Sequence, residues 1–150
     1  MSLDRESELS LAADAPAAAA FLLERGGRLH EPVAGEAGVC WAEMRPGSER
    51  GETYIARIAW TVYPGSPPSL KFATAVGGPV TDRAAWPVAP GYRATELDVC
   101  KPFTAEGFAI HPDWASTSQV WRAEGNPLLA VVRELQRDLN GPGYQGRFRS

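Results

Sequence analysis

The stretch from Tyr54 to Thr74 constrains the fold of this chain more than any other part of the sequence. In its first half every second residue is apolar and would share one face: Tyr54, Ala56, Ile58, Trp60 and Val62. This period of two is typical of a strand with one buried face, although Ile55 and Ala59 interrupt it on the opposite face. We therefore predict a half-buried strand here.

The second half of this stretch begins with a proline-rich loop, Tyr63 to Pro68, and continues as another strand. The three prolines of the loop cannot donate a backbone hydrogen bond, so strand pairing must stop there. Leu70 and Phe72 then fall on one face and Lys71 on the other, which predicts that pairing resumes. The whole stretch is expected to be a hairpin.

The residues before the hairpin predict a helix. Asp14 is expected to cap it, Pro16 lies in its expected first turn, and Gly26-Gly27 ends it. Its expected apolar face consists of Ala17, Ala20, Phe21 and Leu23. Residues 1–13 are expected to be a flexible N-terminus.

Two further strands are predicted at 28–33 and 38–45. In the second, Val39, Trp41 and Glu43 would lie on one face, opposite Cys40, Ala42 and Met44. Because the connections are short, the four strands are expected to form an antiparallel meander of consecutive neighbours.

The C-terminal half predicts a long irregular segment and one helix. Residues 76–96 show no helical or strand period, and Trp86, Pro87, Pro90 and Tyr92 are expected to pin them to the sheet. Residues 126–140 predict a helix, with Asn126 as its cap and Pro127 at its first position. Its apolar stripe is Leu128, Val131, Val132, Leu135 and Leu139. Residues 141–150 would be a C-terminal tail.

Composition argues against several functional classes. The net charge of −3 comes without a basic run, so we expect no nucleic-acid partner. Apolar runs are shorter than the roughly 20 residues of a membrane span, and the acidic start is unlike a signal peptide, so we expect a cytoplasmic protein without membrane contact. The two cysteines lack metal-ligand spacing and the two histidines are far apart, so neither a metal nor a cofactor is expected.

The hairpin resembles the core hairpin of ubiquitin-conjugating (E2) enzymes and their relatives in the UBC-like superfamily. The residues that carry the resemblance are Tyr63, Pro64, Pro67, Pro68, Leu70, Lys71, Phe72 and Thr74. The order of elements agrees over roughly residues 15–140. The resemblance implies an α+β, UBC-like fold in a single domain, 14–140, with an N-terminal helix, a four-stranded antiparallel meander, a long crossover segment and a C-terminal helix. The alternative is a proline-rich loop between two strands of an unrelated sheet.

In E2 enzymes a cysteine in the extended segment carries ubiquitin as a thioester, and this position corresponds to Cys100. Trp121 corresponds to the tryptophan before the long helix. Thioester exchange needs an accessible thiolate, which Lys101 would favour and Asp98 would oppose. The alternative is that Cys100 is a buried apolar residue, as we expect of Cys40 within its strand.

The sequence departs from the E2 pattern in one respect. E2 enzymes carry His-Pro-Asn before the cysteine, whereas here a His-Pro-Asp, His111 to Asp113, follows it. His111 is a candidate acid, base or orienting group. The alternative is a histidine in a turn packed near Trp114. This departure points towards divergent bacterial E2-like proteins, some of which act in defence against phage.

Two functions therefore follow as expectations. In the first, Cys100 accepts a ubiquitin-like protein from an E1-like activating enzyme and passes it to an amine of a protein target. In the second, the chain is a catalytically inactive UBC-like or RWD-like domain that binds protein partners.

Overall fold

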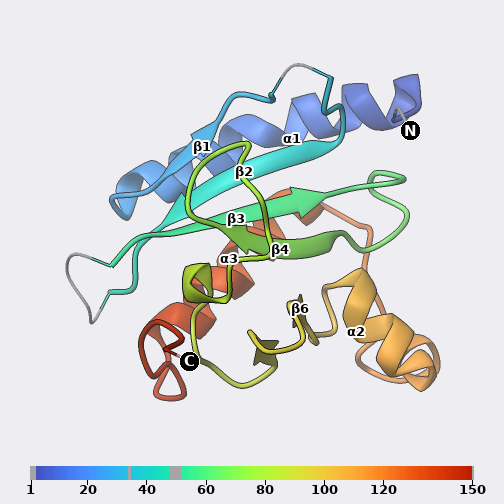
Figure 1. The fold of residues 1–150 in the computed structure, drawn as a ribbon. Helices are drawn as coiled ribbons and strands as arrows, with labels where there is room; N and C mark the ends of the chain where they lie inside the picture. The colour runs from blue at the N-terminus through green and yellow to red at the C-terminus, as the bar shows by residue number, and fades with distance from the viewer. Residues whose placement is uncertain (1–2, 34, 48–51, 150) are drawn as a thin grey trace.

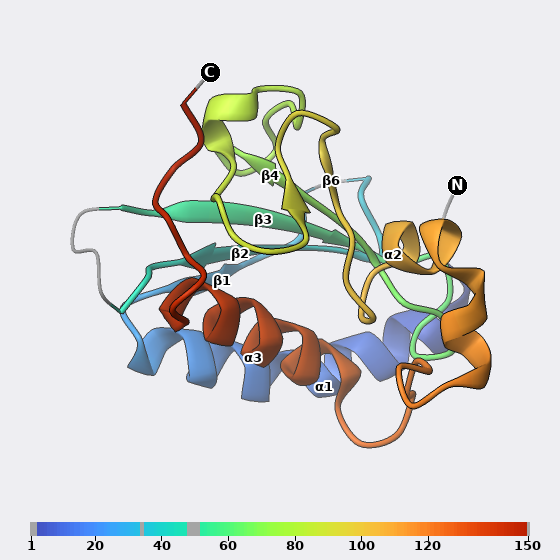
Figure 2. The ribbon, with the colours of Figure 1, turned by 90° about the horizontal axis from the view of Figure 1, so that it is seen from below.

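The computed structural model describes residues 3–33, 35–47 and 52–149. It is a mixed α+β fold in which two long helices lie side by side on one face of a four-stranded antiparallel sheet (Figures 1 and 2). The elements are α1 (Arg5–Glu24), β1 (Arg28–His30), β2 (Val39–Met44), β3 (Tyr54–Ala59), β4 (Ser69–Ala73), the 3₁₀ helix η1 (Arg83–Ala85), β5 (Tyr92–Arg93), β6 (Asp98–Val99), α2 (Ala105–Ile110), the 3₁₀ helix η2 (Pro112–Ser116) and α3 (Pro127–Asn140).

The sheet confirms the predicted hairpin and meander. Its strands lie in the order β1-β2-β3-β4, and each pairs antiparallel with the next. In the hairpin, Ile58 lies opposite Leu70 and Ala56 opposite Phe72, so four apolar side chains meet on one face. All four are fully buried against the helices. Val62, expected on this face, lies beyond the end of β3 and is exposed.

The other face of the sheet is covered by loops. Val39, Trp41 and Ala73 form a small second core there, into which Val33, Val76 and Val80 pack from the segments before β2 and after β4. The predicted alternation along β2 is therefore correct, because Cys40, Ala42 and Met44 belong to the main core.

Helix α1 begins ten residues earlier than predicted. Its cap is Asp4, whose carboxylate accepts hydrogen bonds from the Ser7 N–H at 2.9 Å and the Ser7 hydroxyl at 2.7 Å. Residues 5–13 are thus helical, not a flexible N-terminus. Asp14 and Pro16 lie inside the helix, where a proline costs about 3 kcal/mol. Burial of Leu11 in the main core helps to offset this cost.

The predicted apolar face of α1 is wrong for three of its four residues. Ala17, Ala20 and Leu23 are exposed, whereas Phe21 packs partly buried against the main core. The buried residues are Leu11, Ala18 and Leu22. Helix α3, in contrast, agrees with its prediction. The Asn126 side chain accepts from the Leu129 N–H at 2.9 Å, and every residue of the predicted stripe is buried.

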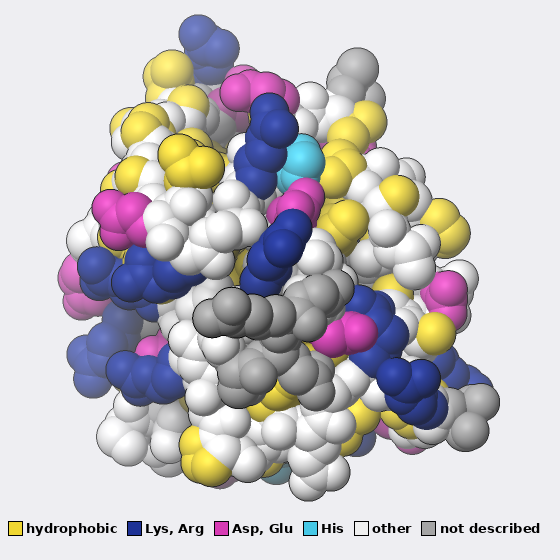
Figure 3. Space-filling model, turned by 90° about the vertical axis from the view of Figure 1, so that its left-hand side faces the viewer, with side chains coloured by type: hydrophobic (Ala, Val, Ile, Leu, Met, Phe, Trp, Pro, Cys, Tyr) yellow, Lys and Arg dark blue, Asp and Glu magenta, His cyan; other side chains and the backbone are white. Residues whose placement is uncertain are grey.

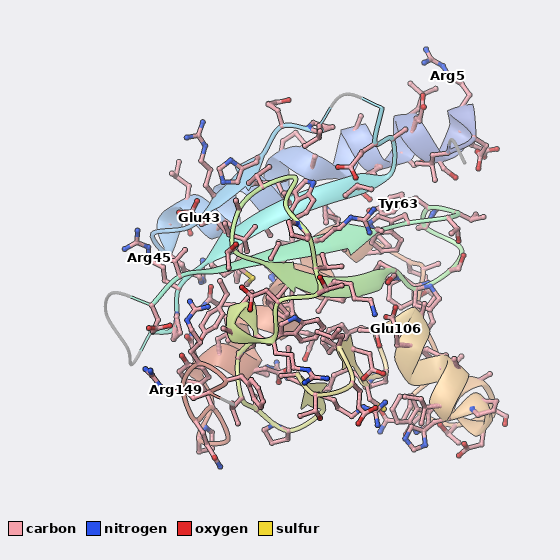
Figure 4. All side chains as sticks on the ribbon, in the orientation of Figure 1. Arg5, Glu43, Arg45, Tyr63, Glu106 and Arg149 are labelled. Carbon is pink, nitrogen blue, oxygen red and sulfur yellow. The ribbon has the colours of Figure 1, made fainter. Side chains whose placement is uncertain are left out.

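The proline-rich loop contacts both long helices through Tyr63, which is labelled in Figure 4. Its hydroxyl donates to the Asp14 carboxylate and accepts from the Leu128 N–H at 3.2 Å. Trp121, in the segment before α3, donates from Nε1 to the Pro64 carbonyl at 2.9 Å. The loop therefore fixes how α1 and α3 sit at one end of the sheet.

The crossing segment runs past the edge strand β4. Trp86 and Tyr92 are buried, with ring centroids 5.2 Å and 6.1 Å from that of Phe72, which confirms that they pin the segment to the sheet. This segment also holds two short strands, β5 and β6, which pair with each other.

The segment after α3 packs back onto the crossing segment. The Val88 N–H donates to the Gly146 carbonyl at 2.8 Å, and the Phe148 N–H donates to the Trp86 carbonyl at 2.8 Å. Arg147 reaches the Glu52 carboxylate at 2.7 Å. Residues 142–148 are therefore part of the folded unit.

Acidic and basic side chains are interspersed on the side of the molecule drawn in Figure 3. Charged pairs among the described residues include His30 with Glu43, at 3.1 Å, and Arg57 with Glu36, at 3.6 Å. Within the described residues, none of the helices has the length and apolar character needed to cross a membrane.

Candidate functional site

Cys100 directly follows β6 in a small two-stranded ribbon. Tyr92 lies opposite Val99 in this ribbon, and both side chains face the main core. The Cys100 N–H donates to the Gly91 carbonyl at 2.7 Å and extends the pairing by one residue. After Cys100, the Thr104 hydroxyl donates to the Val99 carbonyl at 2.6 Å and turns the chain into α2. Cys100 is thus a partly exposed residue on a backbone that hydrogen bonds hold in place.

Gly91 makes this close approach of the two backbones possible. Its φ of +85° lies in the left-handed region, which favours glycine. A Cβ atom there would also come within 2.8 Å of the Cys100 carbonyl oxygen and 2.9 Å of Lys101 Cε. A larger residue would therefore push the Cys100 segment outward.

Asp98, a predicted site residue, binds Arg93 on the neighbouring strand. The two guanidinium nitrogens Nε and Nη2 donate to its two carboxylate oxygens, each at 2.7 Å. This paired hydrogen bond is the main reason that the pKa of Arg93 is raised. The sequence analysis missed Arg93, because only the antiparallel register places it opposite Asp98.

Lys101 points to α3. Its Nζ lies 3.6 Å from Asp138 Oδ2, and the same oxygen accepts a hydrogen bond from the Tyr92 hydroxyl at 2.7 Å. The pKa of Tyr92 is raised, first by burial and then by the charge of Asp138. The expected help from Lys101 to a Cys100 thiolate is therefore offset by a carboxylate.

A hollow of about 410 Å³ begins at the residue after Cys100. It lies between the 101–103 turn, residues 118–122 and the outer face of α3. Trp121 forms part of its wall, and Glu134 and Asp138 contribute carboxylates from α3. The hollow is thus lined by the residue next to Cys100 and not by Cys100 itself.

Helix α2, which follows Cys100, is anchored to the edge of the main sheet. Glu106, labelled in Figure 4, accepts from the Ser69 hydroxyl at 2.5 Å and from the Leu70 N–H at 3.3 Å. The Thr104 side chain caps this helix by accepting from the Gly107 N–H at 3.0 Å. The sequence predicts an irregular stretch here, and the structure has a short helix instead, for which Thr104 is a suitable N-cap residue type.

His111 lies at the C-terminal end of α2, where its N–H donates to the Gly107 carbonyl at 2.8 Å. Its ring stacks on Trp114, with the centroids 4.4 Å apart and the planes at 22°. Asp98 lies in the ribbon that leads into Cys100. Among the described residues, no side-chain interaction joins His111 to Cys100. His111 therefore lies in a turn and packs on Trp114, as the alternative to a catalytic role predicts.

Cys40 has a different environment. It is buried in β2, and burial raises the pKa of its thiol to about 12. It contributes to the wall of a second hollow, about 490 Å³ in volume, between α1 and β1. A thiol with this pKa carries almost no thiolate at neutral pH, so Cys40 is an unreactive core residue.

In the part of the chain that the structure describes, no three His, Cys, Asp or Glu side chains lie close enough together to hold a metal ion. No protein-family model matches the chain, and searches of curated proteins and of solved structures also gave no match.

Proposed function

We propose that the protein is an E2-like carrier of a ubiquitin-like modifier, with Cys100 as the nucleophile. The observation that carries this proposal is the contrast between the two thiols. Cys100 is a partly exposed residue on a turn that hydrogen bonds hold in place, whereas Cys40 is buried with a raised pKa. A sulfur that must meet two large partners in turn needs the first environment.

The proposed reaction has two steps. The Cys100 thiolate attacks the thioester carbonyl that joins the modifier to a cysteine of an E1-like enzyme, and that cysteine leaves as a thiolate. An amine of the target then attacks the new thioester, an amide forms, and Cys100 leaves as a thiolate while the amine proton passes to solvent. Neither step changes an oxidation state.

The arrangement around the sheet supports the UBC-like part of the proposal. The resemblance predicts a helix, a four-stranded meander, the YPxxPP loop and a long C-terminal helix, and these elements occur in this order. Tyr63 in that loop contacts both long helices. The loop thus has a structural role in this chain beyond its sequence likeness.

The test is transfer of a modifier to Cys100. The protein is incubated with an E1-like enzyme, its ubiquitin-like protein and ATP, and the products are separated on a non-reducing gel. We expect an adduct that dithiothreitol removes, that persists in Cys40→Ala and that is absent in Cys100→Ala. An adduct that persists in Cys100→Ala would contradict the proposal.

The second candidate function is an inactive protein-binding module. It is favoured by the positions of the only two asparagines, because Asn126 caps α3 and Asn140 accepts from the Gly47 N–H at 2.7 Å. In E2 enzymes the asparagine of His-Pro-Asn stabilises the oxyanion that forms when the thioester is attacked. Neither asparagine of this chain is free to take that role. Equal binding of the modifier by wild type and Cys100→Ala, with no adduct in either, would support this function.

A further inference from the structure

The two faces of the β5–β6 ribbon differ in character. Tyr92 and Val99 lie opposite each other and are 6% and 0% exposed, so their side chains form the inner face. Arg93 and Asp98 form the next pair, and their side chains lie on the outer face. Cys100 follows Asp98 by two residues, so the alternation of a strand puts its sulfur on this outer face too.

Glycine occupies the position opposite Cys100. The Cys100 N–H donates to the Gly91 carbonyl, so these two residues form the next pair of the ribbon. Gly91 has no side chain, and in this register Arg93 is the diagonal neighbour of Cys100 across the ribbon. Diagonal neighbours of this kind lie within reach of long side chains.

The charges of these groups are coupled. The pKa of Arg93 is raised mainly by its hydrogen bond to Asp98, and the negative charges of Asp98, Glu96 and a Cys100 thiolate add to the effect. A guanidinium on the face that carries the sulfur attracts a negative charge there. The Asp98 carboxylate holds the guanidinium on the ribbon through two hydrogen bonds and partly neutralises its charge.

We propose that Arg93 is a positioning residue that favours the thiolate of Cys100, and that Asp98 restrains this effect by holding and partly neutralising the guanidinium. The inference rests on the proposed role of Cys100 in transfer. The balance between the two charges then sets how readily the sulfur accepts a modifier. Neither residue needs to touch the reacting carbonyl.

Other charged groups lie around the ribbon on the elements that pack against it. On β4, Lys71 donates from Nζ to the Leu97 carbonyl at 2.6 Å, and on α2, Glu106 accepts from the Ser69 hydroxyl. Lys101 pairs with Asp138 on α3, and Asp138 also accepts from the Tyr92 hydroxyl. Glu96 lies in the turn of the ribbon, and Glu134 lies one helical turn before Asp138, on the wall of the hollow. These groups are the same in all variants, so changes at Arg93 and Asp98 can be compared directly.

The expected effects are modest because the pair is partly exposed, with side-chain exposures of 42% for Arg93 and 16% for Asp98. Exposed charge pairs have small interaction energies, which correspond to rate changes of about two- to fivefold at neutral pH. The effects should also shrink at 1 M salt, where the screening length is about 3 Å.

The experiment measures alkylation of Cys100 by iodoacetamide as a function of pH, with Cys40→Ala as the parent. We expect Arg93→Gln to slow alkylation at pH 7 and to move the midpoint of the profile to higher pH. Asp98→Asn should accelerate alkylation and move the midpoint to lower pH. Arg93→Lys, which keeps the charge, should restore most of the parent rate.

A distant pair provides the matched control. Arg5 and Glu8 form an exposed ion pair on α1, so Arg5→Gln changes the net charge equally and should leave the profile unchanged. Midpoints that are unchanged, or that move the same way in Arg93→Gln and Asp98→Asn, would overturn the inference. Because no modifier is present, these outcomes are independent of whether a thioester adduct forms with the proposed partners.

Discussion

The hydroxyl of Tyr63, in the proline-rich loop, donates a hydrogen bond to the carboxylate of Asp14, in the middle of α1. The same hydroxyl accepts from the Leu128 N–H in the first turn of α3. One phenol thus joins two helices that are more than a hundred residues apart along the chain. Its removal should affect the stability of the whole fold.

Tyr63→Phe should lower the free energy of unfolding by about 1–3 kcal/mol, because the buried Leu128 N–H and the partly buried Asp14 carboxylate each lose a hydrogen bond. Urea unfolding at pH 7 measures this loss. Ser66→Ala in the same loop is the control, since the Ser66 hydroxyl makes an exposed contact of 3.4 Å and its removal should cost far less. Equal losses in the two variants would contradict the assigned role of Tyr63.

The stability difference between wild type and Tyr63→Phe should also depend on pH. Burial, followed by the hydrogen bond to Asp14, raises the pKa of Tyr63, so the folded state favours the protonated phenol. In the unfolded chain this group titrates near pH 10. The contribution is therefore complete below pH 10 and is lost as the pH rises above it, so the difference between the two proteins should shrink from pH 9 to pH 11. If the stability difference between the two proteins stayed constant from pH 9 to pH 11, the assigned burial of the Tyr63 hydroxyl would be contradicted.

Leu22 and Leu23 provide a test of the observed face of α1. Leu22 is fully buried and Leu23 is 71% exposed, so the same substitution should have very different effects at neighbouring positions. Leu22→Ala should cost about 2–5 kcal/mol of unfolding free energy, whereas Leu23→Ala should stay within about 0.5 kcal/mol of wild type. The reverse ranking in thermal or urea unfolding would show that the helix presents its other face.

Gly91→Ala should disturb the backbone around Cys100. Gly91 and Gly125 both have a positive φ, but only at Gly91 would a Cβ atom clash with another part of the chain. Gly125→Ala therefore measures the backbone strain alone, about 1 kcal/mol, and the further loss in Gly91→Ala measures the close approach to Cys100. Cys100 alkylation should change in Gly91→Ala and not in Gly125→Ala.

The two cysteines should react at very different rates. At pH 8 iodoacetamide should label Cys100 in the folded protein, because this residue is partly exposed. Cys40 should remain unlabelled until the chain is unfolded in urea, because it is buried and its pKa is raised to about 12. Mass spectrometry of the peptides gives the order directly, and labelling of Cys40 in the folded protein would contradict the description of the core.

The strongest elements of the fold were predictable because their signals are local. Tyr54 to Ile58 alternates with a period of two, and Asn126 and Pro127 begin a helix whose apolar stripe has the helical period. The start of α1 was not predictable in the same way. Asp14 and Pro16 have the residue types of a helix start, and the helix continues through them because Leu11 is buried on its N-terminal side.

The site was predictable only in part. Cys100 could be nominated from the resemblance, but β5 and β6 have two residues each and leave no periodic signal. The partner of Asp98 depends on the register of these strands, so Arg93 was missed. Lys101 was expected to act on its neighbour in the sequence, whereas its long side chain reaches α3 instead.

The segment after α3 has a consequence for the design of truncated proteins. Val88 is held on both sides by this segment, since its N–H donates to Gly146 and its carbonyl accepts from the Gln145 N–H. Val88 lies three residues before Gly91, which sets the backbone position of Cys100. Deletion of the residues after Asn140 would therefore disturb the backbone next to Cys100. A fusion partner should be added after these residues and should not replace them.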